Sequence, residues 1–152
     1  MRYILLFFIL VLINNCSGYS PIFTSNQINF YIEQIKITKD DKLLRKIVKN
    51  LQPYTAQNDK KKISLELSLD KEEFVILRDS KGDPSTLEIK MTLEVLVKLP
   101  NNKNKKILLR EKFTFDNQSN KFELNQYKKS MESNLSDKIF ENLILELRSL
   151  EE

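Results

Sequence analysis

Residues 87–99 read LEIKMTLEVLVKL, and this segment sets the architecture that we predict for the whole chain. Seven apolar residues occupy every second position from Leu87 to Leu99, and polar side chains lie between them, with Leu96 the one exception. Side chains of a β-strand point alternately to its two faces. We therefore predict a long strand here, with one face in the core and the other in water.

A second strand is predicted upstream, where apolar residues alternate over residues 63–69. The charged sequence DKEE at residues 70–73 breaks the alternation, which predicts a bend before residues 74–77, FVIL. Residues 79–84, DSKGDP, have the composition of a hairpin turn in which Gly82 is free to take positive φ. We expect these two strands to form an antiparallel hairpin.

A further strand is predicted downstream of residues 87–99. Residues 100–106, PNNKNKK, have the composition of a turn. Apolar residues then alternate over residues 107–115, and Glu111 interrupts their inward row. Because strands joined by tight turns are antiparallel, the three strands together form a meander.

The segment before these strands predicts a first strand followed by a short helix. Apolar residues alternate over residues 28–37 and change parity near residues 33–34, where we expect a slip or bulge. Thr38 and Asp41 have capping-box spacing for a helix that Pro53 ends. A helix between two strands favours a parallel crossover.

Helical spacing dominates the last part of the chain, residues 124–150. Apolar residues recur there in steps of four and form one stripe. Ser133, Asn134 and Ser136 weaken this pattern midway. We expect a helix with a kink or a frayed first half.

The predicted order is strand, helix, three strands, helix. Two amphipathic helices and strands with one apolar face suit an α+β two-layer sandwich, in which both helices cover one face of a four-stranded mixed sheet. Residues 28–152 are enough for a single domain of this kind. The other face of the sheet is expected to stay polar, open to solvent or a partner.

The first fifteen residues resemble a bacterial export signal. Arg2 precedes an apolar run over residues 3–13, which matches the charged and hydrophobic regions of a secretory signal. A transmembrane helix needs about 20 residues, so this run is too short to remain as a membrane anchor. We expect residues 1–15 to be a lipoprotein signal peptide.

Cys16 is the only cysteine, and it directly follows the predicted signal. The arrangement resembles a lipoprotein box, although Asn14 and Asn15 stand where small residues are usual. We therefore predict lipidation of Cys16, with a palmitate-type acyl anchor, and a lipidated tether over residues 16–27. In bacterial lipoproteins an aspartate after the lipidated cysteine implies retention at the inner membrane. The resemblance therefore implies sorting to the outer membrane, because Ser17 stands at that position. The alternative is that Cys16 is a stray thiol beside a simple signal.

The composition argues against most kinds of enzyme site. The chain has no histidine, one cysteine and two glycines, which removes Ser-His-Asp and Cys-His catalysis, most transition-metal sites and glycine-rich phosphate loops. We expect no enzyme activity, no cofactor and no metal, and a carboxylate-dependent hydrolase is the least favoured class. The 25 basic and 21 acidic side chains are mixed along the chain, so we expect no nucleic-acid partner.

Residues 16–23, CSGYSPIF, resemble the start of alphaproteobacterial members of the LptE (RlpB) family of lipopolysaccharide-assembly lipoproteins. Ser17 is an insertion relative to that start, while the order of predicted elements is the same. The resemblance implies a non-enzymatic, lipid-anchored protein of the cell outer membrane, on its periplasmic side or within the lumen of an LptD-like β-barrel. It also implies that the chain plugs and supports this barrel for lipopolysaccharide transport and assembly at the cell surface. The alternative is a periplasm-facing envelope-assembly or scaffold lipoprotein unrelated to lipopolysaccharide.

Six lysines are expected to gather at one end of the sheet. In a meander, the loop before the second strand and the turn between the third and fourth strands lie at the same end. These segments carry Lys60, Lys61, Lys62, Lys103, Lys105 and Lys106. Such a cluster suits phosphates or acidic sugars, so we predict contacts with lipopolysaccharide there. The alternative is that these lysines are simply solvated.

Overall fold

A computed structural model describes residues 29–56, 59–100 and 103–151 of the 152-residue chain. Its strands and α-helices follow the predicted order β-α-β-β-β-α, which confirms the α+β fold class. α2 ends just before Pro53, as predicted. The elements are β1 (Phe30–Ile37), α2 (Lys42–Leu51), the 3-10 helix η2 (Gln52–Tyr54), β2 (Lys61–Arg78), β3 (Pro84–Lys98), β4 (Asn104–Asp116), α3 (Lys121–Arg148) and the 3-10 helix η3 (Ser149–Glu151).

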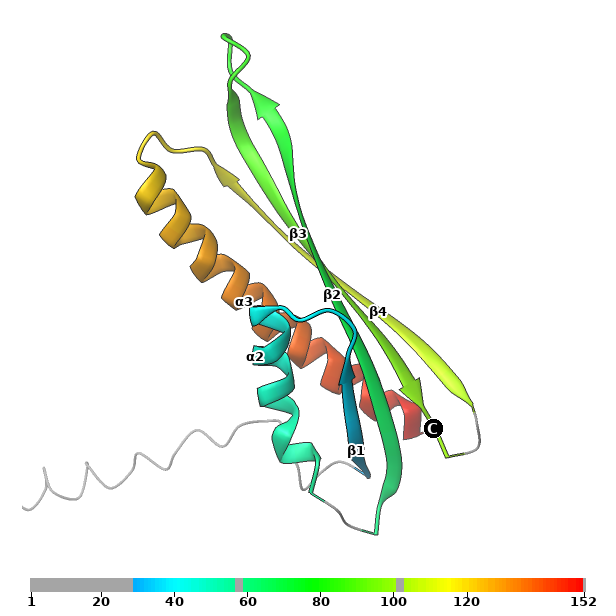
Figure 1. Ribbon diagram of the computed structural model, residues 1–152. Coiled ribbons are helices and arrows are strands. Elements are labelled where there is room, and N and C mark those ends of the chain that lie inside the picture. The colour runs from blue at the N-terminus through cyan, green and yellow to red at the C-terminus, as the bar shows by residue number, and fades with distance from the viewer. Residues whose placement is uncertain (1–28, 57–58, 101–102, 152) are drawn as a thin grey trace, which may run out of the picture.

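One mixed sheet holds the four strands in the spatial order β1-β2-β3-β4 (Figure 1). β1 is parallel to β2, while β2, β3 and β4 form the predicted antiparallel meander. The register between β1 and β2 shifts between Ile32 and Gln34, which confirms the predicted slip. Gly82 takes a φ of +88° in the β2–β3 turn, also as predicted.

The core lies between the sheet and the two α-helices, which cover the same face of the sheet (Figure 1). Side chains from β2, α2 and α3 surround the inward row of β3. That row is buried throughout the strand and consists of Leu87, Ile89, Met91, Leu93, Val95 and Val97. The predicted inward face of the central strand is therefore confirmed.

The start of α2 differs from the prediction. Asp41, and not Thr38, is the N-cap, because its carboxylate accepts hydrogen bonds from the N–H groups of Leu43 and Leu44 at 2.7 and 3.3 Å. The N–H of Thr38 instead donates to the Leu67 carbonyl at 3.0 Å and extends the pairing of β1 with β2. Both residue types make good N-caps, and the strand pairing decides between them.

β2 is not broken at residues 70–73, where a bend was predicted. It pairs with β3 in continuous register through this segment, and its register irregularities lie nearer the hairpin turn. Two of the charged residues are accommodated by ion pairs with α3: Lys71 with Glu132 at 2.9 Å and Glu73 with Lys128 at 2.7 Å. The charges therefore interrupt the apolar pattern without interrupting the strand.

α3 runs without interruption from Lys121 to Arg148, so the predicted kink or fraying does not occur (Figure 1). The serines that suggested it bond to α2. Ser136 is buried and donates to the Leu43 carbonyl at 3.5 Å, and the Ser133 hydroxyl accepts a hydrogen bond from Lys46 Nζ at 2.7 Å. These hydroxyls join the two helices.

β4 begins at Asn104, so Lys105 and Lys106 belong to the strand and not to the predicted turn. β2 likewise begins at Lys61, so Lys61 and Lys62 belong to that strand and not to the predicted loop. Glu111, which interrupts the inward row of β4, is satisfied by α3. Its carboxylate accepts a hydrogen bond from Asn142 at 2.9 Å and pairs with Lys138 at 2.8 Å.

Candidate functional site

The two segments that carry the predicted lysine cluster lie at the same end of the sheet. Lys98 pairs with Ser64 on one side and with Asn104 on the other, so the start of β2 and the β3–β4 connection are close together. Side chains alternate along each strand, however, and this divides the lysines between two faces. Lys61 and Lys105 share the parity of the core residues, while Lys62 and Lys106 share that of the open face.

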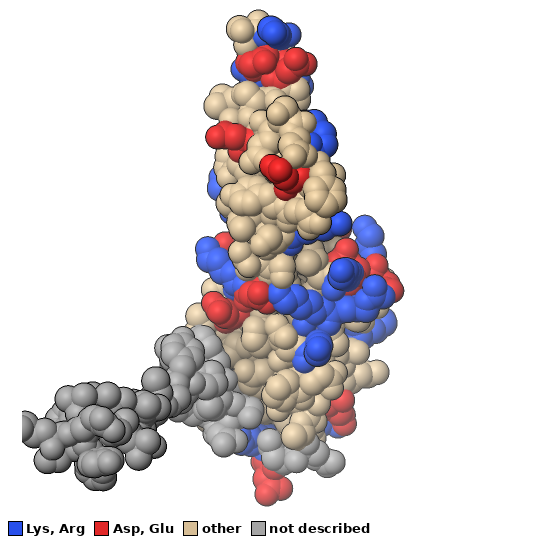
Figure 2. Space-filling view, turned by 90° about the vertical axis from the view of Figure 1, so that its left-hand side faces the viewer, with Lys and Arg blue, Asp and Glu red and all other residues tan. Residues whose placement is uncertain are grey.

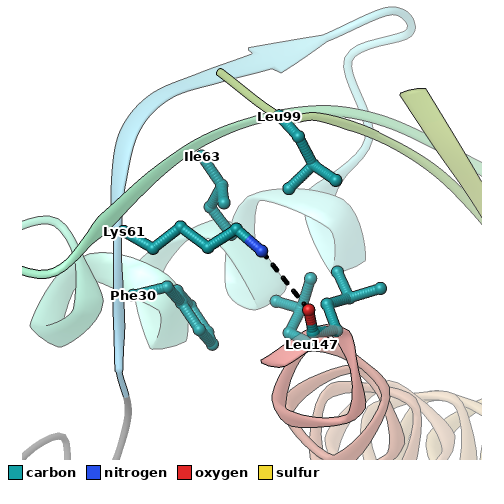
Figure 3. A pocket seen from close by; sticks show the side chains of 6 residues that line it. Phe30, Lys61, Ile63, Leu99 and Leu147 are labelled. Atoms are coloured by element: carbon teal, nitrogen blue, oxygen red, sulfur yellow. Dashed lines mark hydrogen bonds between the residues drawn. The ribbon is translucent and has the colours of Figure 1, made fainter. Parts of the chain in front are cut away.

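Lys61 has a structural partner at this end of the molecule (Figure 3). Its stem lies along the apolar end of the core, and its Nζ donates to the Leu150 carbonyl at 3.4 Å. Lysines often cover apolar surface in this way while the ammonium group reaches a polar partner. The cavity beneath it, of about 10 Å³, has room for no more than a water molecule. Lys61 therefore closes the core beside the end of α3.

Two more lysines of the predicted cluster form ion pairs. Lys62 Nζ lies 2.6 Å from Glu33, and this hydrogen bond and charge raise the pKa of Lys62 above its usual value. Lys106 Nζ lies 2.7 Å from Glu94. Lys103 and Lys105 are exposed and pair with no acidic side chain among the described residues. They are the cations of the predicted cluster best placed to meet an anion.

A cationic groove that the sequence did not predict lies between α2, α3 and the middle of β2. Figure 2 views the side of the molecule on which the two helices lie, and Lys and Arg side chains gather midway along it. The groove has a volume of about 430 Å³. Its lining residues are Asp41, Lys42, Leu43, Lys46, Lys71, Lys129, Glu132 and Ser133.

The groove contains both paired and unpaired lysines. Lys46 pairs with Asp137 at 2.7 Å, and Lys71 pairs with Glu132 on the groove wall. The carboxylate of Asp41 is occupied as the cap of α2. Lys42 and Lys129 are exposed, and neither forms an ion pair within the described part of the chain. These two cations make the groove suited to an acidic group.

An apolar surface lies above this groove, on the hairpin of β2 and β3 that projects beyond the start of α3 (Figure 1). Four consecutive residues of β2 are exposed there: Phe74 by 41%, Val75 by 42%, Ile76 by 48% and Leu77 by 58%. In Figure 2 the upper part of the molecule shows mostly uncharged surface with scattered acidic and basic side chains, and its tip is charged. Because consecutive side chains of a strand point to opposite faces, these residues expose apolar surface on both faces of the hairpin.

The face of the sheet opposite the helices carries mainly charged and polar side chains, as predicted, with Phe74 and Leu108 as exposed apolar exceptions. Glu66 lies at its centre and accepts hydrogen bonds from Lys98 at 3.1 Å and Lys36 at 3.3 Å. These bonds hold the pKa of the Glu66 carboxyl below its usual value. A shallow hollow of about 310 Å³ beside it is lined by Thr38, Glu66, Ser68, Glu94 and Leu96.

Tyr54 also has a displaced pKa. Burial raises the pKa of its hydroxyl, and the nearby charge of Arg148 partly offsets this effect. The shifts of Tyr54, Lys62 and Glu66 all move away from neutral pH, so none of them creates a general acid or base.

Two further observations bear on the predicted classes of site. Across residues 29–56, 59–100 and 103–151, no three His, Cys, Asp or Glu side chains gather as metal ligands would. Within the same ranges, no helix combines the length and apolar character that crossing a membrane requires. Cys16, the predicted lipidation site, lies outside the described residues.

The fold is that of a group of bacterial lipoprotein domains of known structure. The chain is similar to rare lipoprotein B from Shewanella oneidensis, with 17% identity and a TM-score of 0.55, over 78% of this chain and 99% of that chain. It is also similar to an uncharacterized lipoprotein B from Nitrosomonas europaea, with 12% identity and a TM-score of 0.53, over 81% and 88% of the two chains. For a minor lipoprotein from Acinetobacter baumannii the identity is 11% and the TM-score 0.51, over 74% and 88%.

These similarities confirm, at the level of the fold, the resemblance to the LptE (RlpB) family that the sequence indicated. The sequence matches no protein-family model and no curated protein. At such low identities a shared fold does not by itself transfer a function.

Proposed function

We propose that the chain is an LptE-type lipoprotein of the outer membrane, without enzyme activity, that plugs and supports an LptD-like β-barrel. The observation that carries this proposal is the fold, which the chain shares with rare lipoprotein B over nearly all of that protein. The lipoprotein-like start at Cys16 adds an independent indication from sequence. In this proposal an acyl anchor holds the domain at the membrane, and the barrel supplies the passage for lipopolysaccharide.

The surfaces of the domain suit a partner-bound plug. One face of the sheet is covered by helices, while the other carries the ion pairs of Glu66 with Lys36 and Lys98. The projecting hairpin presents the exposed apolar residues 74–77. A domain with these features can face water with its polar sheet surface and bind a protein through its apolar hairpin.

Affinity purification tests the proposed partner. We expect the full-length chain, tagged at its C-terminus and purified from detergent-solubilised envelopes, to bring an outer-membrane β-barrel with it in a fixed ratio. Mass spectrometry would identify the barrel, and its heat-dependent mobility in gels would confirm that it is folded. An eluate that holds periplasmic proteins and no barrel would contradict the proposal and favour the scaffold alternative.

We further propose that Lys103 and Lys105 contact an anionic group of lipopolysaccharide. Reversing both charges, Lys103→Glu with Lys105→Glu, should weaken lipopolysaccharide binding roughly tenfold at low salt, because each exposed ionic contact contributes up to about 1 kcal/mol. Binding by the wild type should also weaken as salt rises. Isothermal titration of the purified chain in detergent would measure both effects.

The matched control is Lys39→Glu with Lys49→Glu. These lysines are exposed, lie at the β1–α2 turn and on α2, and give the same change in net charge. The control should bind lipopolysaccharide like the wild type. Equal weakening in both variants would show a general effect of net charge. Binding that changes neither with salt nor with any of the four substitutions would show that these lysines are simply solvated.

A further inference from the structure

β2 is much longer than the strand beside it. β1 pairs only with the first part of β2, from Lys61 to Leu67, whereas β3 pairs with β2 along nearly its whole length. Among the described strands, none pairs with the outer edge of residues 68–78 of β2. Residues 68–78 of β2, the part nearer the hairpin turn, therefore form an open sheet edge, whereas residues 61–67 lie between β1 and β3.

The backbone groups that face this open edge can be identified from the pairing below it. The N–H of Lys61 donates to the Asn29 carbonyl, and the carbonyl of Leu67 accepts from the N–H of Thr38, so odd-numbered residues of β2 face the β1 side. Alternation along a strand continues this pattern as far as Val75, beyond which the register with β3 shifts. Leu69, Lys71, Glu73 and Val75 thus direct their N–H and C=O groups to the open edge.

The side chains along this edge change from charged to apolar toward the hairpin tip. Proteins usually protect a free sheet edge with charged side chains. Such charges are present at residues 70–73 of β2 and along β4, which forms the other edge of the sheet. Residues 74–77 carry none and are exposed by 41 to 58%. A free edge with uncharged, exposed side chains is the arrangement that accepts an added strand.

The cationic groove adjoins the lower part of the same edge. Lys71 belongs both to the edge of β2 and to the wall of the groove, which also holds Lys42 and Lys129. Lys71 and Val75 lie four residues apart, which corresponds to about 13 Å along a strand. A segment paired with this edge would meet cations at one level and apolar side chains at the other.

We infer that the open edge of β2 binds an extended segment of a partner polypeptide by strand addition. The segment is apolar beside Val75 and carries an acidic side chain beside Lys71, where Lys42 and Lys129 receive it. A lipid chain would cover residues 74–77 but would leave the edge N–H and C=O groups without partners. This inference rests on the proposed function, because it assigns the added segment to the β-barrel partner.

Val75→Pro tests the backbone pairing directly. Proline removes the N–H that faces the open edge, while the regular β2–β3 pairing before Val75 uses the N–H groups of even-numbered residues and is kept. We expect the full-length variant to recover roughly tenfold less barrel from solubilised envelopes. Val75→Thr is the matched control, because it keeps the N–H and the β-branched shape, and it should recover barrel like the wild type. Thermal melts of both variants would verify that they are folded.

A photo-crosslinking residue tests where the barrel contacts this chain, and its result does not depend on a change in stability. Placed at Leu77 it should crosslink to the barrel, whereas at Leu108, which is 40% exposed on β4, it should not. Lys42→Glu with Lys129→Glu should also lower barrel recovery, while Lys39→Glu with Lys49→Glu should not.

The outcomes separate this inference from the proposed function. A wild-type chain that recovers no barrel would overturn both. Two results together would overturn the inference alone. The Val75→Pro chain would be folded and recover barrel like the wild type, and the chain with the crosslinking residue at Leu77 would give no crosslink to the barrel. A crosslink at Leu77 to a second copy of the chain, with concentration-dependent dimers, would assign the edge to self-association and overturn it as well.

Discussion

Leu93→Asp is expected to abolish folding of the domain. Leu93 is 0% exposed at the centre of β3, between Leu69 of β2 and Leu109 of β4. The substitution removes burial worth roughly 1.5–3 kcal/mol and places an unpaired carboxylate in the core, which costs several kcal/mol more. Because domains of this size are stable by about 5–15 kcal/mol, the sum removes most or all of that stability. Circular dichroism melts and the level of the protein in cells would measure the effect.

Leu96→Asp is the matched control for this prediction. Leu96 belongs to the same strand but to the opposite face, where it lies between Glu66 and Lys106. A carboxylate there stays in contact with water, so we expect a loss of stability of no more than about 1 kcal/mol. If Leu93→Asp melted like the wild type while Leu96→Asp did not, the face assigned to the core would be wrong.

The sheet was predictable because its signals are local. The period of two over residues 87–99 defines both the strand and its inward face, whatever the rest of the chain does. The change of parity near residues 33–34 likewise identified the register shift of β1. The helix between the first two strands predicted that β1 and β2 would be parallel.

The errors arose where a distant residue decides the local structure. Thr38 and Asp41 are both good N-caps, and only the hydrogen bond from Thr38 to Leu67 shows which one is used. Ser133 and Ser136 weaken the helical pattern of α3, but they bond to α2, which the sequence does not place beside them. Tertiary contacts outweigh intrinsic propensity in both cases.

The candidate sites were less predictable than the fold. Spacing placed the six lysines at one end of the sheet but could not show that Lys62 and Lys106 pair with Glu33 and Glu94. The cationic groove was missed because it combines residues from three elements. The open edge was not predicted, because the bend expected at residues 70–73 ended the regular part of the predicted second strand near residue 69.

Cys16→Ala is expected to remove the protein from the membrane. The prediction depends on the apolar run over residues 3–13 that ends just before the only cysteine. Each buried methylene of an acyl chain contributes about 0.8 kcal/mol, so several chains hold a protein firmly while none leaves only its protein contacts. Cells grown with an alkyne-labelled fatty acid should show a labelled wild-type chain and an unlabelled variant. Fractionation should move the variant from the membrane to the soluble fraction, apart from any portion bound to a barrel.

Ser17→Ala provides the control, because it alters the neighbouring residue and keeps the thiol. It should be labelled like the wild type. Equal labelling of the wild type and Cys16→Ala would show that Cys16 is a stray thiol and that the acyl group, if any, is elsewhere. Because residues 16–27 are predicted to be a tether outside the domain, the variant should melt like the wild type. A variant that is unlabelled yet still recovers the barrel would show that the domain binds its partner unaided and that the lipid serves to concentrate it at the membrane.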